Sequence, residues 1–302
     1  MRRERVLLLA LAVLAALVWF AAAAPPRPLT LTFLDVGQGD SLLIQTPDGR
    51  AVLVDGGGRP GVDSRAYDIG RQVVLPSLLV QGVRRLNAVV VTHAHEDHCG
   101  GLGAVVSQLP TDWLLVPAAP DSDLPGYQRL LALARERQIK VRRLRAGMSL
   151  YLGKGISCQV LAPPRPPLLG TDADENNNSV VLLVRYGRFR ALLPGDIERP
   201  AEEWLVARRA PLRCVVLKVA HHGSSSSTTT AFLQAARPQA AVISVAQQNP
   251  FGHPHRDTLL RLQRSRVRVY RTDWQGAITV TSDGVSCHIR TTTGRPQAFS
   301  LN

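Results

Sequence analysis

The chain has 302 residues, of which 45% are hydrophobic, and a formal net charge of +13 at pH 7. This apolar content is ample for the core of one large domain or of two small ones. The four cysteines are far apart and show no CxxC spacing, so we expect small apolar side chains inside the fold and not a disulfide framework.

The positive charge comes from 36 Lys and Arg against 23 acidic residues, and arginines gather in stretches such as "RRLRAG" and "RLQRSRVRVYR". Such an excess favours a polyanionic partner, which could be nucleic acid, an anionic glycopolymer or a lipid surface. The alternative is an arginine-rich composition that reflects a GC-rich genome and indicates no partner.

The chain begins with three arginines among its first five residues, and an unbroken apolar run follows from Val6 to Ala24. A basic start, an apolar middle and small residues near the end are typical of an export signal. The run is also long enough to span a bilayer if it is not cleaved. We therefore predict a signal peptide or single membrane anchor over residues 1–28. The rest of the chain, residues 29–302, is then extracytoplasmic: secreted, periplasmic or anchored to the outer face of the cytoplasmic membrane.

The remaining sequence predicts more than ten strands with helices between them and no linker long enough to separate domains. Strands are expected at 29–36, 41–46, 51–55, 85–93, 112–118, 156–163, 179–187, 189–196, 214–220, 240–246, 266–271, 277–282 and 285–290. Helices are expected at 100–109, 125–138, 199–209, 228–237 and 256–265. The proline-rich stretch 162–179 is predicted to be a loop, and the end of the Ser/Thr run 224–230 to be the N-cap of a helix.

One short stretch, "VVVTHAHEDHCGG", suggests the chemistry of the protein. After a run of β-branched residues, it presents His93, His95, Asp97 and His98 in a loop at the end of a strand. Imidazole nitrogens and carboxylates are ligands of zinc and its first-row neighbours, whereas a packed core would leave these ring nitrogens without partners. Since four ligands this close together do not fit one ion comfortably, the stretch predicts two adjacent metal sites.

Other predicted strand ends supply further candidate ligands. Asp196 ends "FRALLPGD", His221 and His222 follow "CVVLKVA", and His253 and His255 lie in "NPFGHPH". Seven of the eight histidines thus fall in three strand-end clusters. Only His288 lies apart, and we expect it to be structural.

These motifs resemble the metallo-β-lactamase fold, whose HxHxDH signature matches "THAHEDH", with Asp55 in "VLVDGGG", Asp196 and His221 matching the flanking motifs. The closer resemblance is to the ComEC-type hydrolase domain of bacterial competence proteins. It rests on "FLDVGQGDSLLIQTPDGRAVLVDGGG", "NNNSVVLLVRYGRFRALLPGDIE", "LKVAHHGSSSS" and "NPFGHPH", and it covers roughly residues 30–290. The resemblance implies an α+β fold, a four-layered αβ/βα sandwich with a dinuclear site at one edge.

The resemblance also suggests which residues bind each ion. His93 and His95 are assigned to one ion, Asp97, His98 and His221 to the other, and Asp196 to both. The sequence leaves open which of His221 and His222 is the ligand. The expected cofactor is one or two divalent metal ions, zinc, manganese or both. Asp40 and Asp55 are expected to support the loops through hydrogen bonds to backbone and histidine.

The chain departs from the family pattern in two ways. ComEC proteins carry this domain on a multi-spanning channel, whereas this sequence has one apolar segment, so a separate channel would have to pass DNA. The superfamily usually supplies another histidine before Asp196, but none occurs between His98 and His221. Asn178 or Ser179, near that place, could offer an oxygen ligand, which favours manganese over zinc at the weaker site.

A two-metal site suits hydrolysis of a phosphodiester, and also of a lactone, lactam or thioester. The candidate catalytic residues are Asp97, His222, His253 and Asn178. His222 and His253 could protonate a leaving group or hold a phosphate, or they could be packing residues; Asp97 could instead support a ligand. We predict an exported phosphodiesterase or nuclease acting on DNA during uptake. The alternatives are a hydrolase of phosphocholine or other cell-wall esters, and a DNA-binding module without activity.

Overall fold

The structure is a computed structural model that describes residues 11–13, 15, 19, 27–59, 67–120, 122–294 and 297–300. Most of the predicted export signal, within residues 1–28, lies outside these described residues. Among the described residues, no helix is both long and apolar enough to cross a membrane.

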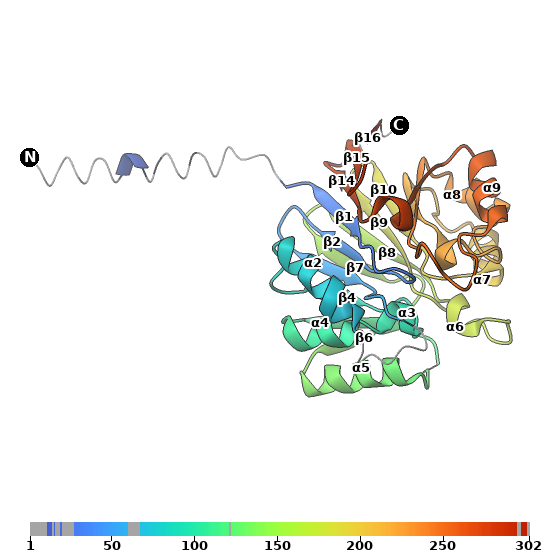
Figure 1. The fold of residues 1–302 in the computed structure, drawn as a ribbon, viewed down its shortest axis with the longest axis horizontal. Coiled ribbons are helices and arrows are strands. Elements are labelled where there is room, and N and C mark those ends of the chain that lie inside the picture. Colours follow the sequence, from blue (N-terminus) through green and yellow to red (C-terminus); the bar gives the residue numbers. More distant parts are fainter. Residues whose placement is uncertain are drawn as a thin grey trace, which may run out of the picture.

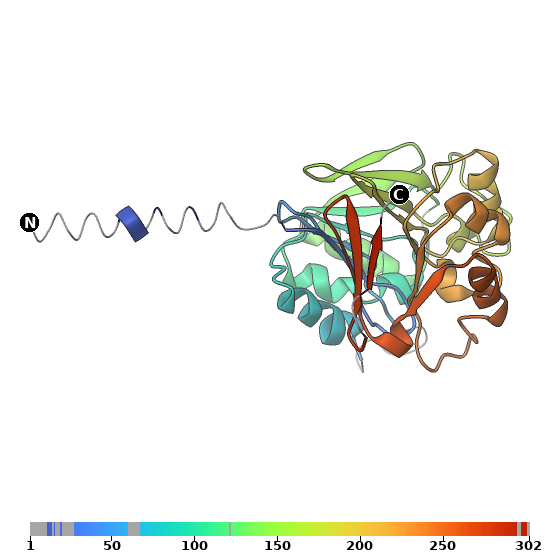
Figure 2. The ribbon, with the colours of Figure 1, turned by 90° about the horizontal axis from the view of Figure 1, so that it is seen from above.

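Two mixed sheets pack face to face, and helices cover the outer face of each (Figures 1 and 2). The first sheet has the order β16 (Gln297–Ser300), β15 (Ser286–Thr291), β14 (Ile278–Ser282), β1 (Leu29–Phe33), β2 (Leu42–Gln45), β3 (Ala51–Val54), β4 (Ala88–Val90), β5 (Trp113–Pro117), β6 (Lys140–Leu144). The second has the order β13 (Arg268–Arg271), β12 (Ala240–Ile243), β11 (Val216–Lys218), β10 (Phe189–Leu193), β9 (Val181–Tyr186), β8 (Ile156–Ala162), β7 (Ser149–Gly153).

The helices divide between the two outer layers and the loops at the sheet edges. They are the π-helix η1 (Gly70–Val74), α2 (Leu75–Val80), α3 (Glu96–Cys99), α4 (Leu102–Gln108), α5 (Pro125–Glu136), α6 (Asp174–Asn177), α7 (Arg199–Ala207), the 3-10 helix η2 (Ala220–Gly223), α8 (Thr230–Ala236), α9 (Arg256–Arg264) and α10 (Thr272–Gln275). Helices α2, α4 and α5 cover the first sheet, and α7, α8 and α9 the second (Figure 1). The predicted four-layered αβ/βα sandwich is confirmed.

Alternating side chains of the central strands explain why the fold has three apolar layers. In β4, Ala88 and Val90 face the opposite sheet, whereas Val89 faces the helices. Both faces of such a strand are buried, so its sequence is a continuous run of apolar residues. The inner core lies between the sheets, and an outer core lies beneath each helical layer.

Strand direction brings the polar loops together. Strands β3 to β6 run parallel in the first sheet, and β10 to β13 run parallel in the second. In sheets of this kind, ligands bind beyond the carboxyl ends of the strands. The "THAHEDH" loop follows β4, Asp196 follows β10, and His222 follows β11, so these segments meet at one edge.

The structure also shows elements that the sequence did not predict. The segment 70–80 is helical, as η1 and α2, a short turn α6 lies inside the proline-rich loop, and β6, β7 and β16 are additional strands. All three of these strands lie at sheet edges. Much of an edge strand is exposed to solvent, so its sequence need not show a regular apolar pattern. In β6, four of the five residues are exposed.

Two smaller predictions are confirmed. Thr229, at the end of the Ser/Thr run, caps α8, and its hydroxyl accepts a hydrogen bond from the backbone N–H of Phe232. The four cysteines, Cys99, Cys158, Cys214 and Cys287, are free and buried.

Candidate metal centre

The HxHxDH loop is wound so that its polar side chains converge. His93 follows β4 and is fully buried, and one turn of helix, α3, begins after His95. The carbonyl of His95 accepts hydrogen bonds from the backbone N–H groups of His98 and Cys99, at 3.0 Å each. This turn brings Asp97 and His98 back toward the strand end that carries His93.

The Nδ1 atoms of His98 and His222 have hydrogen-bond partners that fix the orientations of the two rings. Nδ1 of His98 lies 2.9 Å from Asp55 Oδ2, and Nδ1 of His222 lies 3.0 Å from the carbonyl of Ser244. A histidine that donates through Nδ1 leaves its Nε2 lone pair free for a ligand. The predicted supporting role of Asp55 is confirmed, since its carboxylate also accepts hydrogen bonds from the backbone and hydroxyl of Thr92.

The inner atoms meet around one carboxylate. Nε2 of His98 and Nε2 of His222 each lie 3.2 Å from Asp196 Oδ2, and Nε2 of His222 lies 3.3 Å from Asp97 Oδ2. On the other side, His93 Nε2 lies 3.1 Å from His95 Nδ1. The ligand atoms of His93, His98 and Asp196 lie within 4.8 Å of one another, as do those of Asp97, His98 and His222.

The donor set fits divalent cations. The Nε2 atoms of His98 and His222 are buried and make no hydrogen bond, although a carboxylate oxygen of Asp196 lies 3.2 Å from each. A buried polar atom without a hydrogen bond is costly, and a cation between the rings and the carboxylates would remove that cost. Imidazole nitrogen together with carboxylate oxygen suits zinc, manganese or iron. His93, His95 and Asp196 would hold one ion, and Asp97, His98, His222 and Asp196 the other.

Two predicted site residues lie outside this cluster. Nδ1 of His221, the expected ligand, lies 3.2 Å from Glu198 Oε1, and it is His222 whose ring joins the carboxylates. Both histidines have left-handed backbone angles, with φ of 49° and 52°, a strained conformation that separates their side chains. Asn178, a candidate catalytic residue, holds the proline-rich loop instead, through the backbone of Leu168 and the carbonyl of Asp174.

The other histidines have different surroundings. The ring of His253 stacks on His222, with centroids 6.5 Å apart, which places it beside the cluster. His255 is the N-cap of α9, and its Nδ1 accepts a hydrogen bond from the backbone of Asp257. His288 is exposed on β15, away from the cluster.

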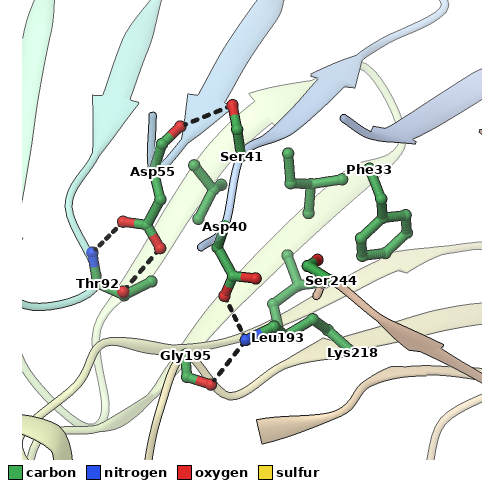
Figure 3. A pocket seen from close by; sticks show the side chains of 11 residues that line it. Phe33, Asp40, Ser41, Asp55, Thr92, Leu193, Gly195, Lys218 and Ser244 are labelled. Carbon is green, nitrogen blue, oxygen red and sulfur yellow. Dashed lines mark hydrogen bonds and ion pairs between the residues drawn. The ribbon is translucent and has the colours of Figure 1, made fainter. Parts of the chain in front are cut away.

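The sequence did not single out Lys218, the last residue of β11. Its ammonium group is buried and contacts Asp40 and, at 3.2 Å, the carbonyl of Gly195 (Figure 3). It also lies 3.2 Å from Asp196 Oδ1. The sequence did offer a sign of this role, because a lysine within the apolar strand "CVVLKVA" is expected to be buried, and a buried ammonium requires anionic partners. Asp40 was expected to support the loops, and its backbone N–H donates to the carbonyl of Asp97 at 3.1 Å.

Glycine is required where the loop of Asp40 passes the HxHxDH loop. Gly39 has a φ of +135°, and a Cβ added there would lie 2.3 Å from the carbonyl oxygen of Asp97. A side chain would therefore push the two loops apart. The close approach brings Asp40 under the cluster, beside a small cavity of about 20 Å³ that Asp55, Thr92 and Lys218 help to line (Figure 3).

Burial and the carboxylates act in opposite directions on the ring pKa values. Burial disfavours the charged form of His222, but Asp196 and Asp97 outweigh it and raise the pKa to about 10. For His98, Asp196 and Asp55 likewise outweigh burial and raise the pKa. Burial and the neighbouring histidines lower the pKa of His253 to about 4, so that this ring is neutral at pH 7. Protons and a cation would therefore compete for His98 and His222.

A cluster of histidines and carboxylates at one edge of an αβ/βα sandwich is typical of metal-dependent hydrolases with this architecture. The chain belongs to the metallo-beta-lactamase superfamily, whose family model matches residues 34–247. The family and the cluster together support a metal-dependent hydrolase.

Relatives in sequence agree with the predicted ComEC-type hydrolase domain. The chain is 34% identical over 253 residues to ComE operon protein 3 of Bacillus subtilis (strain 168), which covers 81% of this chain and 32% of that protein. It is 30% identical over 257 residues to competence protein ComA of Neisseria gonorrhoeae, covering 85% and 33%. The chain therefore spans about a third of the length of these curated relatives.

Solved structures show the same fold. One is CmlA, a diiron β-hydroxylase from Streptomyces venezuelae, with a TM-score of 0.55 and 15% sequence identity over 85% of this chain and 55% of that one.

Proposed function

We propose that this chain is an exported, divalent-metal-dependent phosphodiesterase that cleaves DNA during DNA uptake. The observation that carries the proposal is the convergence of His93, His95, Asp97, His98, His222 and Asp196 at one sheet edge, where two buried ring nitrogens make no hydrogen bond. The competence-related names of the relatives supply the DNA-uptake context.

Divalent ions held by these residues would activate a water molecule and stabilise negative charge on a phosphoryl oxygen. The protein's own groups then orient the substrate. His253 lies beside His222 and is neutral at pH 7, so it is suited to donate a hydrogen bond to a phosphate oxygen. It is not suited to protonate a leaving group at that pH unless the substrate's charge raises its pKa.

An aromatic series leads from the cluster to the surface. His253 stacks on buried His222 with an angle of 30° between the rings, and Phe251 stacks on His253 with an angle of 27° and centroids 5.7 Å apart. Phe251 is 54% exposed, so one end of the series is open to solvent. Exposed aromatic rings bind single-stranded nucleic acid because every base can stack on them. This feature favours DNA over a cell-wall ester.

Replacing Phe251 with alanine should raise KM for single-stranded DNA about fivefold to a hundredfold, since stacking of one base contributes roughly 1–3 kcal/mol. The kinetics on bis-p-nitrophenyl phosphate should change much less, because that small substrate needs only the metal centre. Steady-state kinetics of the wild type and of Phe251→Ala on both substrates measure these changes in KM.

Tyr151 provides the matched control. It is 68% exposed and lies near Arg50, at the amino end of β3 and so at the opposite sheet edge. Tyr151→Ala should leave KM for DNA unchanged. An equal loss in both variants, or no loss in Phe251→Ala, would argue against a base-stacking role.

A substrate screen tests the function itself. Purified protein is incubated with bis-p-nitrophenyl phosphate, single- and double-stranded DNA, phosphocholine esters and nitrocefin, each with manganese, zinc or magnesium. We expect metal-dependent cleavage of the phosphodiester and of DNA. Cleavage of phosphocholine esters alone would indicate the cell-wall alternative. No cleavage, with tight and salt-sensitive DNA binding, would indicate a DNA-binding module.

The proposed location follows from the basic start and the apolar run before residue 25. A fusion of residues 1–40 to alkaline phosphatase should be active in bacteria, because that enzyme is active only after export. An inactive fusion that accumulates in the cytoplasm would contradict export. If the run is not cleaved, it would anchor the domain beside a separate DNA-uptake channel.

A further inference from the structure

Lys218 is a buried cation next to residues proposed to bind cations. It is 4% exposed, and its ammonium group contacts three oxygen atoms, one each from Asp40, Asp196 and Gly195. Figure 3 shows the contacts with Asp40 and Gly195. An ammonium group has three N–H donors, so these contacts account for all of them. Two carboxylates offset the cost of burying the charge.

The position of the ammonium group restricts the carboxylate of Asp196. Its Oδ1 lies 3.2 Å from Lys218 Nζ, while its Oδ2 lies 3.2 Å from Nε2 of both His98 and His222. One oxygen thus faces the lysine and the other faces the proposed ion sites. An oxygen that accepts a hydrogen bond from an ammonium group is a weaker ligand for an ion, so an ion would bind Asp196 mainly through Oδ2 while this contact is kept.

The same charge opposes other cations. In a buried site, a charge acts more strongly on its neighbours than it would in water. Lys218 therefore repels a divalent ion bound through Asp196 Oδ2. Asp40 has the opposite effect, because its carboxylate balances the ammonium charge and lies 3.7 Å from Nδ1 of both His98 and His222.

We propose that Lys218 is a positioning residue that limits Asp196 to one ligand oxygen and, together with Asp40, lowers and sets the affinity of the centre for divalent ions. The inference rests on the metal centre of the proposed function. It predicts opposite effects for two substitutions at one buried ion pair, which a purely structural role would not produce.

Isothermal titration of EDTA-treated protein with Mn²⁺ tests the proposal. Lys218→Met, close to lysine in shape but uncharged, should bind Mn²⁺ at least about tenfold more tightly than the wild type. Asp40→Asn should bind it at least about tenfold more weakly. The double variant should return toward the wild-type affinity, because the two charge changes cancel. Lys154→Met, at an exposed position, is the control for charge loss and should bind like the wild type.

A second measurement reports on the ligand geometry and not on affinity. The visible spectrum of bound Co²⁺ depends on the number of ligands, and Lys218→Met frees Asp196 Oδ1 to become one. The spectrum should therefore change in Lys218→Met and stay unchanged in Lys154→Met.

Weaker or unchanged Mn²⁺ binding by folded Lys218→Met would overturn the proposal. If that variant does not fold without metal, Asp40→Asn decides, and unchanged or tighter binding overturns the proposal. A wild-type protein that binds no Mn²⁺ would instead contradict the metal centre itself, and this inference with it.

Discussion

Replacing Asp97 with alanine should lower the rate of phosphodiester hydrolysis by about a thousandfold or more, which corresponds to about 4 kcal/mol of transition-state stabilisation. Asp97 is a proposed ligand, and its carboxylate lies 3.3 Å from His222 Nε2. The fold should remain, because the contact that joins this loop to Asp40 uses the backbone carbonyl of Asp97, which alanine keeps. Turnover at saturating manganese and the circular dichroism spectrum measure the two effects.

His98→Ala should abolish turnover in the same way but should also lower the free energy of unfolding by about 1–3 kcal/mol. The reason is that Asp55 Oδ2 would lose its 2.9 Å contact with His98 Nδ1 in a buried place. His288→Ala, at an exposed position on β15, is the matched histidine control and should retain full activity. Near wild-type turnover in Asp97→Ala or His98→Ala would mean that the cluster is not catalytic.

The purified protein should retain about one tightly bound divalent ion, and added manganese should activate it more than added zinc. In the proposed assignment, Asp97, His98, His222 and Asp196 would give one ion four protein ligands, whereas His93, His95 and Asp196 would give the other three. The hydroxyl of Ser179 already accepts a hydrogen bond from the backbone of Asp196, and Asn178 holds a loop. The second ion should therefore complete its coordination with oxygen ligands such as water, and it should exchange readily with ions in solution.

Metal analysis of the purified protein and activation curves for each metal measure this occupancy. Acid should release the tight ion. The raised pKa values of His98 and His222 determine the direction of this pH dependence. These rings take up protons as the pH falls, so the affinity for the ion must decrease in that direction. Two tightly held zinc ions and no effect of manganese would show that a further residue completes the second site.

The sequence, through its motifs and their family resemblance, was sufficient to predict the fold class and most of the side chains that converge in the cluster. Continuous apolar runs mark strands that are buried on both faces. The loops that follow two such runs carry His93, His95, Asp97, His98 and Asp196. Since the carboxyl ends of parallel strands meet at one edge, the order of strands and motifs already implied a shared site. The sequence was less informative at β6, β7 and β16, because edge strands need no regular apolar face.

Tertiary structure decided what depends on direction and on distant partners. His221 and His222 are adjacent and chemically identical, and only the left-handed turn that contains both separates their rings. Lys218 ends a strand of the second sheet and Asp40 lies in the loop between β1 and β2 of the first, so the two pair only because the sheets pack face to face. The local sequence shows which side chains follow each strand and which faces of that strand are apolar. Which atom faces which is determined by contacts between segments far apart in the chain, and these exist only once the two sheets have packed.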